Sequence, residues 1–355
     1  MKDSIAEVLA ITNSSRFTAY TQGVSVCLPT GVTINVKIEK TTKSLRPVGL
    51  RFSAFAFMTE VSAGDFRGFG FGEAPTKLVA FQKSIAEGVE RALYKSLKGT
   101  PFGTLNSNGW AAHIDKERAF KSAVDELVER DAILVHWLSK TPMAEIKPAT
   151  WPTWLTQWTQ TELRLSPTFN QLRVLVSSMG YKPTITTVLM NSDGHAVLSH
   201  ATAPSIEQAL CKALAETCRI AQIAMEGTHT ASSAALATES ESDVTISPED
   251  HAMYYAFHEP LPHWIFGEPI NWVVARAQWM FGHKMFIAST VSTLDPKFYQ
   301  ITDGPLVVGY ATSDLIQNLY FGRTQDAQAR GLINVRRIEE VRHNEGLNLM
   351  PHCVP

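Results

Sequence analysis

Alternating and helically spaced hydrophobic residues divide this sequence into strand and helix segments. Residues 23–39 and 47–60 are rich in β-branched and aromatic side chains with partial alternation, which predicts strands that pair. Further strands are expected at 172–178, 183–189, 196–200, 285–291 and 305–311. Helical spacing predicts helices over 76–97, 115–138, 151–160, 205–226 and 312–322. Because strands and helices alternate, we predict an α/β class, with α+β as the alternative.

Few features suggest a division into separate domains. The segment 227–249 is rich in Ser, Thr and Ala, which is typical of a mobile surface loop. No clear linker splits the chain elsewhere. We therefore expect a single large unit over residues 1–355, in which mixed sheets pack against helices.

Composition and charge exclude several classes of protein. The chain has 355 residues, a formal net charge of −2, 45% hydrophobic and 19% charged residues, which is ordinary for a globular protein and excludes intrinsic disorder. The near-neutral charge argues against nucleic acid as the main partner. No apolar run reaches the length of a membrane span, and the start lacks a signal-peptide pattern. The four cysteines are too sparse for a disulfide framework or a zinc site, so we expect a cytoplasmic protein.

The most informative feature is a motif, E-x-x-E-R, that occurs in two of the predicted helices. Its copies, Glu87–Arg91 and Glu126–Arg130, lie 39 residues apart. A Glu followed four residues later by an Arg usually forms a solvent-exposed ion pair worth about 0.2–0.5 kcal/mol. The first copy, taken alone, fits that interpretation.

The second copy does not fit it, because its helix is apolar nearly all round. Ile133 and Trp137 fall in the same angular sector as Glu129, which predicts a largely buried helix. In the third helix, Ile223 likewise falls in the sector of Glu216. Buried carboxylates need cationic partners, and five glutamates from three helices outnumber the neighbouring bases. The residue types therefore favour a Mg²⁺–nucleotide site without a P-loop, with Arg and Lys at the phosphates.

Other candidate residues fit structural roles better. Three histidines lack the spacing of metal ligands, namely His113, His136 and His195. Three tryptophans recur at helical spacing and are expected to pack in the core, namely Trp151, Trp154 and Trp158. The serine-hydrolase motif G-x-S-x-G is absent.

Four stretches of the sequence together resemble the YcaO-domain family. They are GFGFGEAPTKLVAFQKSIAEGVERAL with its core at 70–93, NSNGWAAHIDKERAFKSAVDELVERDAILVHW at 106–137, HAVLSHATAPSIEQALCKALAETCRIAQ at 195–222, and the terminal PHCVP at 351–355. They occur in the order of the family and span nearly the whole chain. The resemblance implies a YcaO-like fold and ATP-dependent activation of backbone amides, with ATP and Mg²⁺ held among glutamates of these helices.

The resemblance also implies roles for individual residues. The expected Mg²⁺ ligands are Glu90, Glu129 and Glu216. The residues expected to contact the nucleotide are Glu87, Arg91, Glu126, Arg130, Lys212, Lys83 and Arg118. Of these, Arg130 and Lys212 are expected to contact phosphate. Spacing alone does not separate Mg²⁺ ligands from nucleotide contacts. Azoline-forming members end in a proline-rich P-H-P-F-P that reaches toward the active site, so the residues expected in catalysis are Arg130, His352 and Pro355.

Several positions depart from the family pattern. Lys83 stands where the first motif usually has Ser, Arg118 where the second has Glu, and Arg219 where the third has Gln. In the tail, Cys353 and Val354 replace Pro and Phe. Two interpretations follow: an introduced arginine replaces a cation at the phosphates, or the chain is a degenerate scaffold or regulatory subunit of a peptide-maturation complex.

The resemblance implies that the product is an azoline formed from Cys, Ser or Thr of a ribosomally synthesised peptide. Thioamide and amidine formation follow from the same activation with other nucleophiles and stay open. An unrelated α/β protein, with Glu126 and Glu129 in solvent, is the third alternative. The expected partners are a precursor peptide, an E1-like or other leader-peptide-recognition protein, a flavin dehydrogenase of the same complex and a second copy of this chain, with neither nucleic acid nor membrane.

Overall fold

The computed structural model describes nine ranges of the chain. These are residues 24–27, 33–43, 55–100, 107–177, 181–225, 248–302, 306–321, 323–340 and 346–352. The chain forms two compact units. Unit 1 comprises residues 1–45, 53–126 and 296–312, and unit 2 comprises residues 46–52, 127–295 and 313–355. A single YcaO-like domain over 1–355 stays a prediction.

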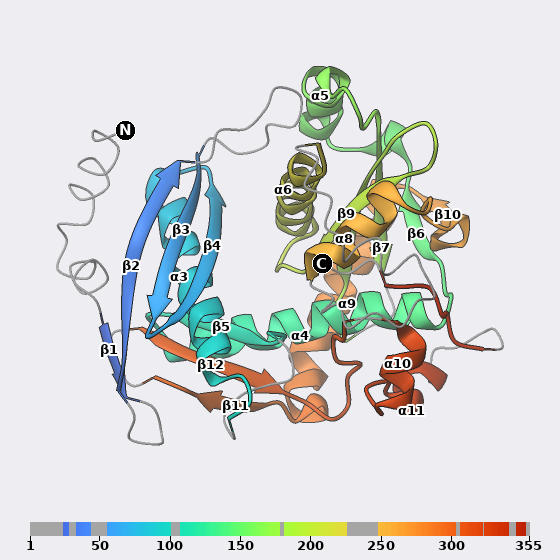
Figure 1. The fold of residues 1–355 in the computed structure, drawn as a ribbon. Coiled ribbons are helices and arrows are strands. Elements are labelled where there is room, and N and C mark those ends of the chain that lie inside the picture. Colours follow the sequence, from blue (N-terminus) through green and yellow to red (C-terminus); the bar gives the residue numbers. More distant parts are fainter. Residues whose placement is uncertain are drawn as a thin grey trace. The chain divides into compact units, whose positions relative to one another are not determined.

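Unit 1 contains an antiparallel four-stranded sheet in the order β1 (Val24–Cys27), β2 (Thr33–Lys43), β3 (Phe55–Ala63) and β4 (Phe66–Ala74). Helix α3 (Lys77–Leu97) lies along one face of this sheet (Figure 1). The close approach requires glycine on β4, because a Cβ at Gly70 would lie 1.9 Å from the carbonyl oxygen of Ser84 on α3. The glycine-rich stretch, whose residue types alone predict a tight turn, is instead a strand that packs closely against a helix.

A second antiparallel sheet of unit 1 has the order β11 (Lys297–Gln300), β12 (Val307–Thr312) and β5 (Trp110–His113). The rings of Trp110 and Tyr310 stack with their centroids 5.3 Å apart, and Tyr299 stacks on the other side of Tyr310. Trp110, Val308 and Tyr310 belong to the same buried cluster as the apolar face of α3. The core of unit 1 thus joins α3 to both sheets.

Unit 2 is built on a five-stranded mixed sheet. Its order is β10 (Phe266–Ile270), β6 (Met143–Ile146), β7 (Gln171–Ser177), β8 (Thr184–Met190) and β9 (Ala196–Ala201). Only the β10–β6 pair is parallel among these pairings. Every described residue of β8 and β9 is buried, which requires cover on both faces of the sheet.

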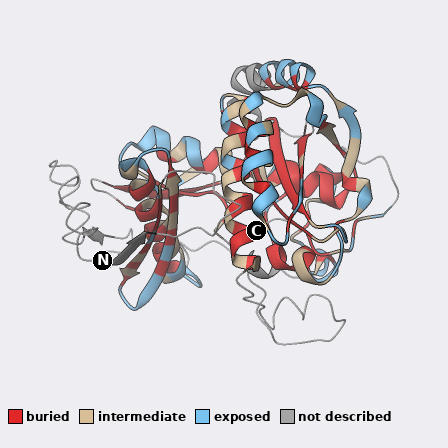
Figure 2. Ribbon diagram, turned by 90° about the horizontal axis from the view of Figure 1, so that it is seen from above, coloured by how far each residue is buried: buried red, intermediate tan, exposed pale blue. Residues whose placement is uncertain are grey.

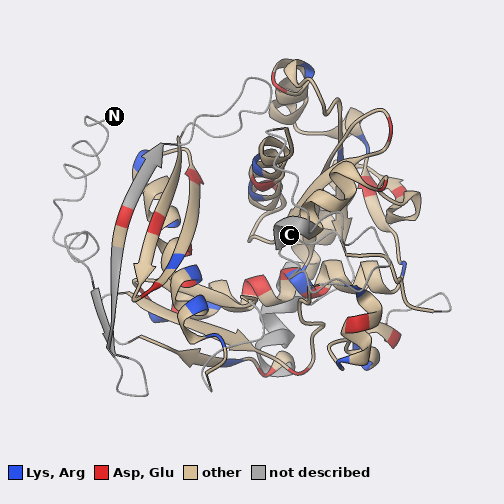
Figure 3. Ribbon diagram, in the orientation of Figure 1, with Lys and Arg blue, Asp and Glu red and all other residues tan. Residues whose placement is uncertain are grey.

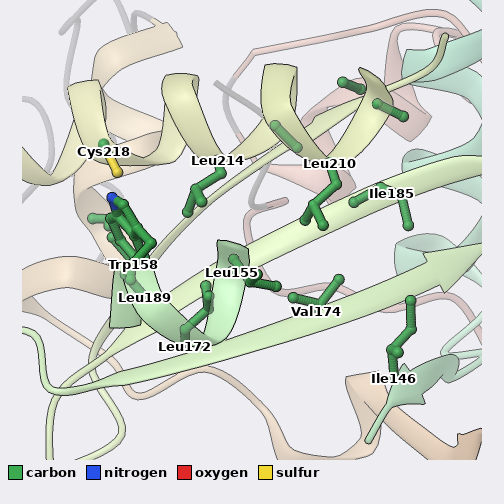
Figure 4. Close-up of a cluster of buried hydrophobic side chains, with 14 of the residues drawn as sticks. Ile146, Leu155, Trp158, Leu172, Val174, Ile185, Leu189, Leu210, Leu214 and Cys218 are labelled. Carbon is green, nitrogen blue, oxygen red and sulfur yellow. The ribbon is translucent and has the colours of Figure 1, made fainter. Parts of the chain in front are cut away.

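One face of this sheet packs against α6 (Ile206–Met225) and α5 (Thr153–Thr161). Figure 4 shows Leu210, Leu214 and Cys218 of α6 pointing toward the strands. Trp158 belongs to this buried cluster, and Trp151 and Trp154 pack against it, as predicted. The burial colouring in Figure 2 shows the same pattern, with buried residues on the strands and on the inner sides of the helices.

The opposite face packs against the second half of α4 (Lys116–Leu138). Ile133, Trp137 and Leu138 are all buried there, which confirms the prediction that this helix is largely buried. The remaining helices among the described residues are α8 (Pro248–Phe257), α9 (Trp272–Leu294), α10 (Thr324–Ala329) and α11 (Val335–Glu339), with 3-10 turns at Pro148–Thr150, Leu163–Leu165 and His263–Ile265. The prediction of mixed sheets packed with helices is confirmed.

Two sequence predictions are wrong. The expected strand at 285–291 lies inside α9, and the expected helix at 312–322 does not form. In the second case, side chains bind the backbone in place of helical hydrogen bonds, since Ser313 Oγ accepts from the N–H of Leu315 and Gln317 donates its N–H to Asp131. The predicted loop 227–249 lies outside the described residues except for its last two, which begin α8. No helix in the described ranges is both long enough and apolar enough to span a bilayer.

His136 of α4 is buried between two hydrogen bonds, as its predicted structural role requires. Its Nδ1–H donates to the carbonyl oxygen of Thr141 at 2.8 Å, and Nε2 accepts from Ser177 Oγ at 2.6 Å. Burial lowers the pKa of His136 from 6.5 to about 4. The folded protein therefore holds the neutral imidazole.

This pKa predicts a loss of stability in mild acid. Below pH 6.5 the unfolded chain binds a proton at His136 before the folded chain does, so stability is full above that pH and falls as the pH approaches 4. We expect about 3 kcal/mol of the unfolding free energy to be lost through this residue. Urea unfolding at a series of pH values should show a shallower acid dependence in His136→Gln than in the wild type. Identical slopes would contradict the assignment.

Candidate functional site

Glu87 and Arg91, of the first E-x-x-E-R motif, tie α3 to β4 in unit 1. Glu87 Oε2 accepts the N–H of Phe71 at 2.6 Å, and Arg91 pairs with Glu87 Oε1 at 2.6 Å. Arg91 also donates to the carbonyl oxygen of Phe69 at 3.0 Å. These contacts give both residues a structural role in the packing of the helix on the strand.

Glu90, one turn away on the same helix, has a different environment. Its Oε1 accepts the N–H of Ala112 on β5 at 2.5 Å. Burial raises the pKa of Glu90 well above its usual value, and the negative charges of Glu126 and Glu87 raise it further. The charge of Glu126 on α4 thus acts on the carboxylate of Glu90 on α3. Such a pair favours a divalent cation, which removes the repulsion between the two charges.

Glu129, the second glutamate of the second motif, lies in unit 2 and binds the end of β9. Glu129 Oε2 accepts the N–H of Thr202 at 2.8 Å, and Lys212 Nζ of α6 donates to the carbonyl oxygen of Thr202 at 3.2 Å. One peptide segment thus brings together two residues that the sequence assigned to the same site. Figure 3 shows acidic and basic residues on both α4 and α6. Glu126 and Glu129 are each partly buried, so the alternative with both in bulk solvent is not supported.

Glu216 of α6 is held by Arg219. Arg219 Nε donates to Glu216 Oε2 at 3.0 Å, and a second guanidinium nitrogen binds Oε1. This bidentate pair occupies both carboxylate oxygens. Within the described residues, no three His, Cys, Asp or Glu side chains gather closely enough to hold a metal ion. Glu90 belongs to unit 1, whereas Glu129 and Glu216 belong to unit 2, and their roles as Mg²⁺ ligands stay predictions.

Lys83 and Arg118, the first two departures from the pattern, lie at the surface of unit 1. Lys83 Nζ donates to the carbonyl oxygen of Glu73 at 3.1 Å. The N–H of Arg118 donates to Asp115 Oδ1 at 2.9 Å near the start of α4, and its guanidinium charge reaches His113, whose pKa is lowered first by burial and then by this charge. Both cations thus have local contacts, and their nucleotide roles stay predictions.

Pro351 and His352 are buried in unit 2. His352 is 0% exposed, its Nε2–H donates to the carbonyl oxygen of Tyr320, and its ring stacks on His251 with 4.0 Å between centroids. Tyr255 donates its hydroxyl to the carbonyl oxygen of Pro351 at 2.7 Å. Burial and the neighbouring His251 lower the pKa of His352 well below its usual value, which makes the imidazole neutral. Pro355, Cys353 and Val354 lie outside the described residues.

Sequence reasoning missed His200, which lies on β9 beside Arg130. Both ring nitrogens of His200 and the Nε of Arg130 are buried without a hydrogen-bond partner in the described part of the chain. Burial and the charge of Arg130 lower the pKa of His200 well below its usual value. The signal was present in the sequence, because His200 continues the alternation of Ala196 and Leu198 at a position where a buried strand normally has an apolar residue.

Comparison with known proteins identifies the family. The model described as "YcaO cyclodehydratase, ATP- and Mg²⁺-binding" matches residues 66–284. The chain belongs to the YcaO family. No curated protein matches the chain in sequence. ATP and Mg²⁺ are the cofactors of this YcaO protein.

Solved YcaO-type structures share the fold. One is YcaO from Methanopyrus kandleri bound with AMPPCP and Mg²⁺, with a TM-score of 0.52 and 13% identity over 78% of this chain and 85% of that chain. Another is a heterocyclase in complex with substrate and cofactor, with a TM-score of 0.52 and 13% identity over 84% of this chain. This YcaO chain spans 53% of the heterocyclase. At these identities the comparison shows the fold alone.

Two observations on this YcaO chain fit ATP and Mg²⁺. The carboxylates of Glu90 and Glu126 repel each other, and Mg²⁺ is commonly bound by one or two carboxylates together with substrate phosphates. The unpartnered Nε of Arg130 fits an anionic oxygen such as that of a phosphate. The residues present thus suit a divalent cation and a phosphoryl group.

Proposed function

We propose that this YcaO chain activates backbone amides of a precursor peptide with ATP and Mg²⁺, and that Cys, Ser or Thr residues become azolines. The observation that carries this proposal is the family match over residues 66–284, because that range contains both E-x-x-E-R motifs and the Lys212–Glu216 motif. The juxtaposed carboxylates of Glu90 and Glu126 support it, because they supply the negative charge that a magnesium ion requires.

In the proposed reaction, the thiol or hydroxyl of the substrate residue attacks the carbonyl carbon of the preceding peptide bond and loses its proton. When bound, ATP with Mg²⁺ supplies the phosphoryl group that lets the former carbonyl oxygen leave as phosphate. The amide nitrogen loses its proton as the carbon–nitrogen double bond forms. The peptide thus loses the atoms of one water, and ATP becomes ADP and phosphate.

The residues of this chain divide these tasks. Glu90 and Glu126 would hold the cation, and Arg130 would contact a phosphoryl oxygen. Glu129 and Lys212 orient the segment at Thr202 by binding its N–H and its carbonyl oxygen. Placing cations and donors where negative charge develops stabilises the transition state more than any other single contribution.

We further propose that the chain works in the cytoplasm, as a homodimer, with an E1-like or other leader-recognition protein and a flavin dehydrogenase that oxidises the azoline. These partners follow from the family assignment. The catalytic roles of His352 and Pro355 also stay proposals. The burial of the chain at Pro351 and His352 supports a fixed path for the preceding residues of the tail.

The test is a reconstituted assay with the full chain, its E1-like partner, Mg·ATP and candidate precursor peptide. We expect phosphate release that depends on peptide, together with a peptide mass lower by one water for each ring formed. Replacement of the amide oxygen by sulfur or by an amine nitrogen, without ring closure by Cys, Ser or Thr, would indicate thioamide or amidine formation. A rate of phosphate release that is the same with and without peptide would contradict amide activation.

The ion pair between Glu216 and Arg219 favours a second candidate, a scaffold or regulatory subunit. An arginine that occupies both oxygens of Glu216 competes with a cation for that carboxylate. Calorimetry with Mg·ATP separates the two functions. Binding in the micromolar to low millimolar range supports the enzyme, whereas the absence of heat at saturating Mg·ATP supports the scaffold.

A further inference from the structure

His200 occupies an unusual position in unit 2. It lies near the end of β9, directly opposite Thr186 of β8, and is 4% exposed. Ala196 and Leu198, which alternate with it on the strand, belong to the buried cluster that α4 covers. The imidazole therefore stands on the sheet face that holds Ala196 and Leu198, with the hydroxyl side chain of Thr186 opposite it. Neither ring nitrogen has a hydrogen-bond partner in the described part of the chain.

The charged group that acts on His200 is a cation. The charge of Arg130, on the α4 side of the sheet, acts on both His200 and His352. The carboxylate of Glu129, next to Arg130 in sequence, is bound to the N–H of Thr202, two residues beyond His200. Three nitrogens, Nε of Arg130 and both ring nitrogens of His200, are thus buried without a hydrogen-bond partner in the described residues.

The physical cost of this arrangement points to a missing ligand. A buried polar group without a hydrogen bond is destabilising, and three such atoms lie on Arg130 and His200. A metal cation would suit a lone imidazole but is repelled by the adjacent guanidinium. An oxyanion suits both groups, because the guanidinium supplies charge and the neutral imidazole supplies one N–H.

We propose that His200 and Arg130 form one binding site for a phosphoryl oxyanion, in which His200 donates its N–H to an oxygen that Arg130 neutralises. This inference rests on the proposed use of ATP and adds His200 to the residues that bind its phosphoryl groups. His200 is therefore a binding residue of this particular chain, recognisable only from its burial and its unpartnered nitrogens.

The test compares His200→Leu with His200→Gln. Leucine removes the N–H and suits the apolar face beside Leu198, so this variant should fold with an unchanged or higher melting temperature. We expect its Kd for Mg·ATP, measured by calorimetry, to rise about 10-fold, as expected for the loss of one hydrogen bond to a charged group. Glutamine offers an N–H at similar reach and should restore most of the affinity. His263→Gln, at an exposed position, is the matched control and should bind as the wild type does.

Imidazole ¹⁵N spectra of the wild type provide a second measurement that does not depend on turnover. The His200 signal, assigned by its absence from the His200→Leu spectrum, should shift on addition of inorganic phosphate with Mg·ADP and on addition of Mg·ATP. The signal of His136, which already has two hydrogen bonds, should stay in place. A shift with phosphate and Mg·ADP but none with Mg·ATP would assign the site to the released phosphate.

The outcomes separate this inference from the proposed function. If the wild type binds Mg·ATP and His200→Leu binds it equally well, with no shift of the His200 signal, the inference is overturned and the enzyme proposal stands. If the wild type binds neither Mg·ATP nor phosphate, both are overturned. The inference would also be overturned if His200→Leu bound Mg·ATP as tightly as the wild type while His200→Gln bound it weakly.

Discussion

Replacing Glu90 by Gln lowers Mg·ATP-dependent phosphate release about 100-fold or more and raises the melting temperature of the ligand-free protein. The loss of activity follows because the amide cannot give Mg²⁺ the charge that a carboxylate gives. The gain in stability follows because Gln removes a buried charge that Glu126 repels, while its oxygen still accepts the N–H of Ala112. Phosphate-release kinetics and thermal unfolding with and without Mg·ATP measure the two effects.

The control for Glu90→Gln is Glu60→Gln on β3. Glu60 pairs with the exposed Arg67, so this variant makes the same chemical change at an ion pair on the surface. Its phosphate release should equal that of the wild type, and its melting temperature should change little. Undiminished turnover in Glu90→Gln, or a Mg²⁺-induced stabilisation equal to that of the wild type, would show that the carboxylates of Glu90 and Glu126 do not hold the metal.

Replacing Asp131 by Asn destabilises unit 2 by about 3–5 kcal/mol, because it leaves the buried guanidinium of Arg337 with only the exposed Glu340, 3.5 Å away, as a counter-charge. Asp131 is 0% exposed and accepts from Arg337 Nη2 at 2.8 Å. It also accepts the N–H of Gln317 at 2.8 Å, and the Arg337 guanidinium lies 4.7 Å from the centre of the Tyr181 ring. This cluster joins α4 to α11 and to the segment after β12. Urea unfolding followed by tryptophan fluorescence measures the loss.

Two further variants isolate the charge effect. The double variant Asp131→Asn with Arg337→Met removes both charges and should recover most of the lost stability. Arg336→Ala, one residue away, breaks an exposed ion pair with Glu340 and should cost less than about 1 kcal/mol. A double variant as unstable as Asp131→Asn would show that packing, and not the unpaired charge, dominates at this position.

The sequence predicted the elements whose hydrophobic pattern agrees with their final environment. The helix predicted at 115–138 is α4, because a pattern that is apolar nearly all round is satisfied only by burial, as at Trp137. The segment 285–291 has β-branched and aromatic residues but forms part of α9, where tertiary context overrides local preference. The sequence alone did not show which role the glycines around Gly70 have, because glycine is favoured both in a turn and where a strand approaches a helix closely.

For the site, motif spacing placed Glu90 and Glu126 on two separate helices, and the structure adds that the charge of Glu126 acts on Glu90. Spacing could not predict that Arg219 binds Glu216, or that Glu87 serves the backbone of Phe71, because both depend on side-chain rotamers and on neighbouring strands. The sequence pattern did not identify His200 as a site residue for a related reason. A single histidine in a strand has chemical meaning only when its unpartnered nitrogens and its cationic neighbour are known.

Helix α4 begins in unit 1 and ends in unit 2, so the boundary after Glu126 falls inside 23 residues of continuous helix. Cleaving the gene there to express each half by itself would cut the helical hydrogen bonds that cross residues 126 and 127 and expose new helix ends. It would also separate Glu126 from Glu129, which share one motif. Dissection of this protein therefore has to proceed by point substitution, with the polypeptide kept whole.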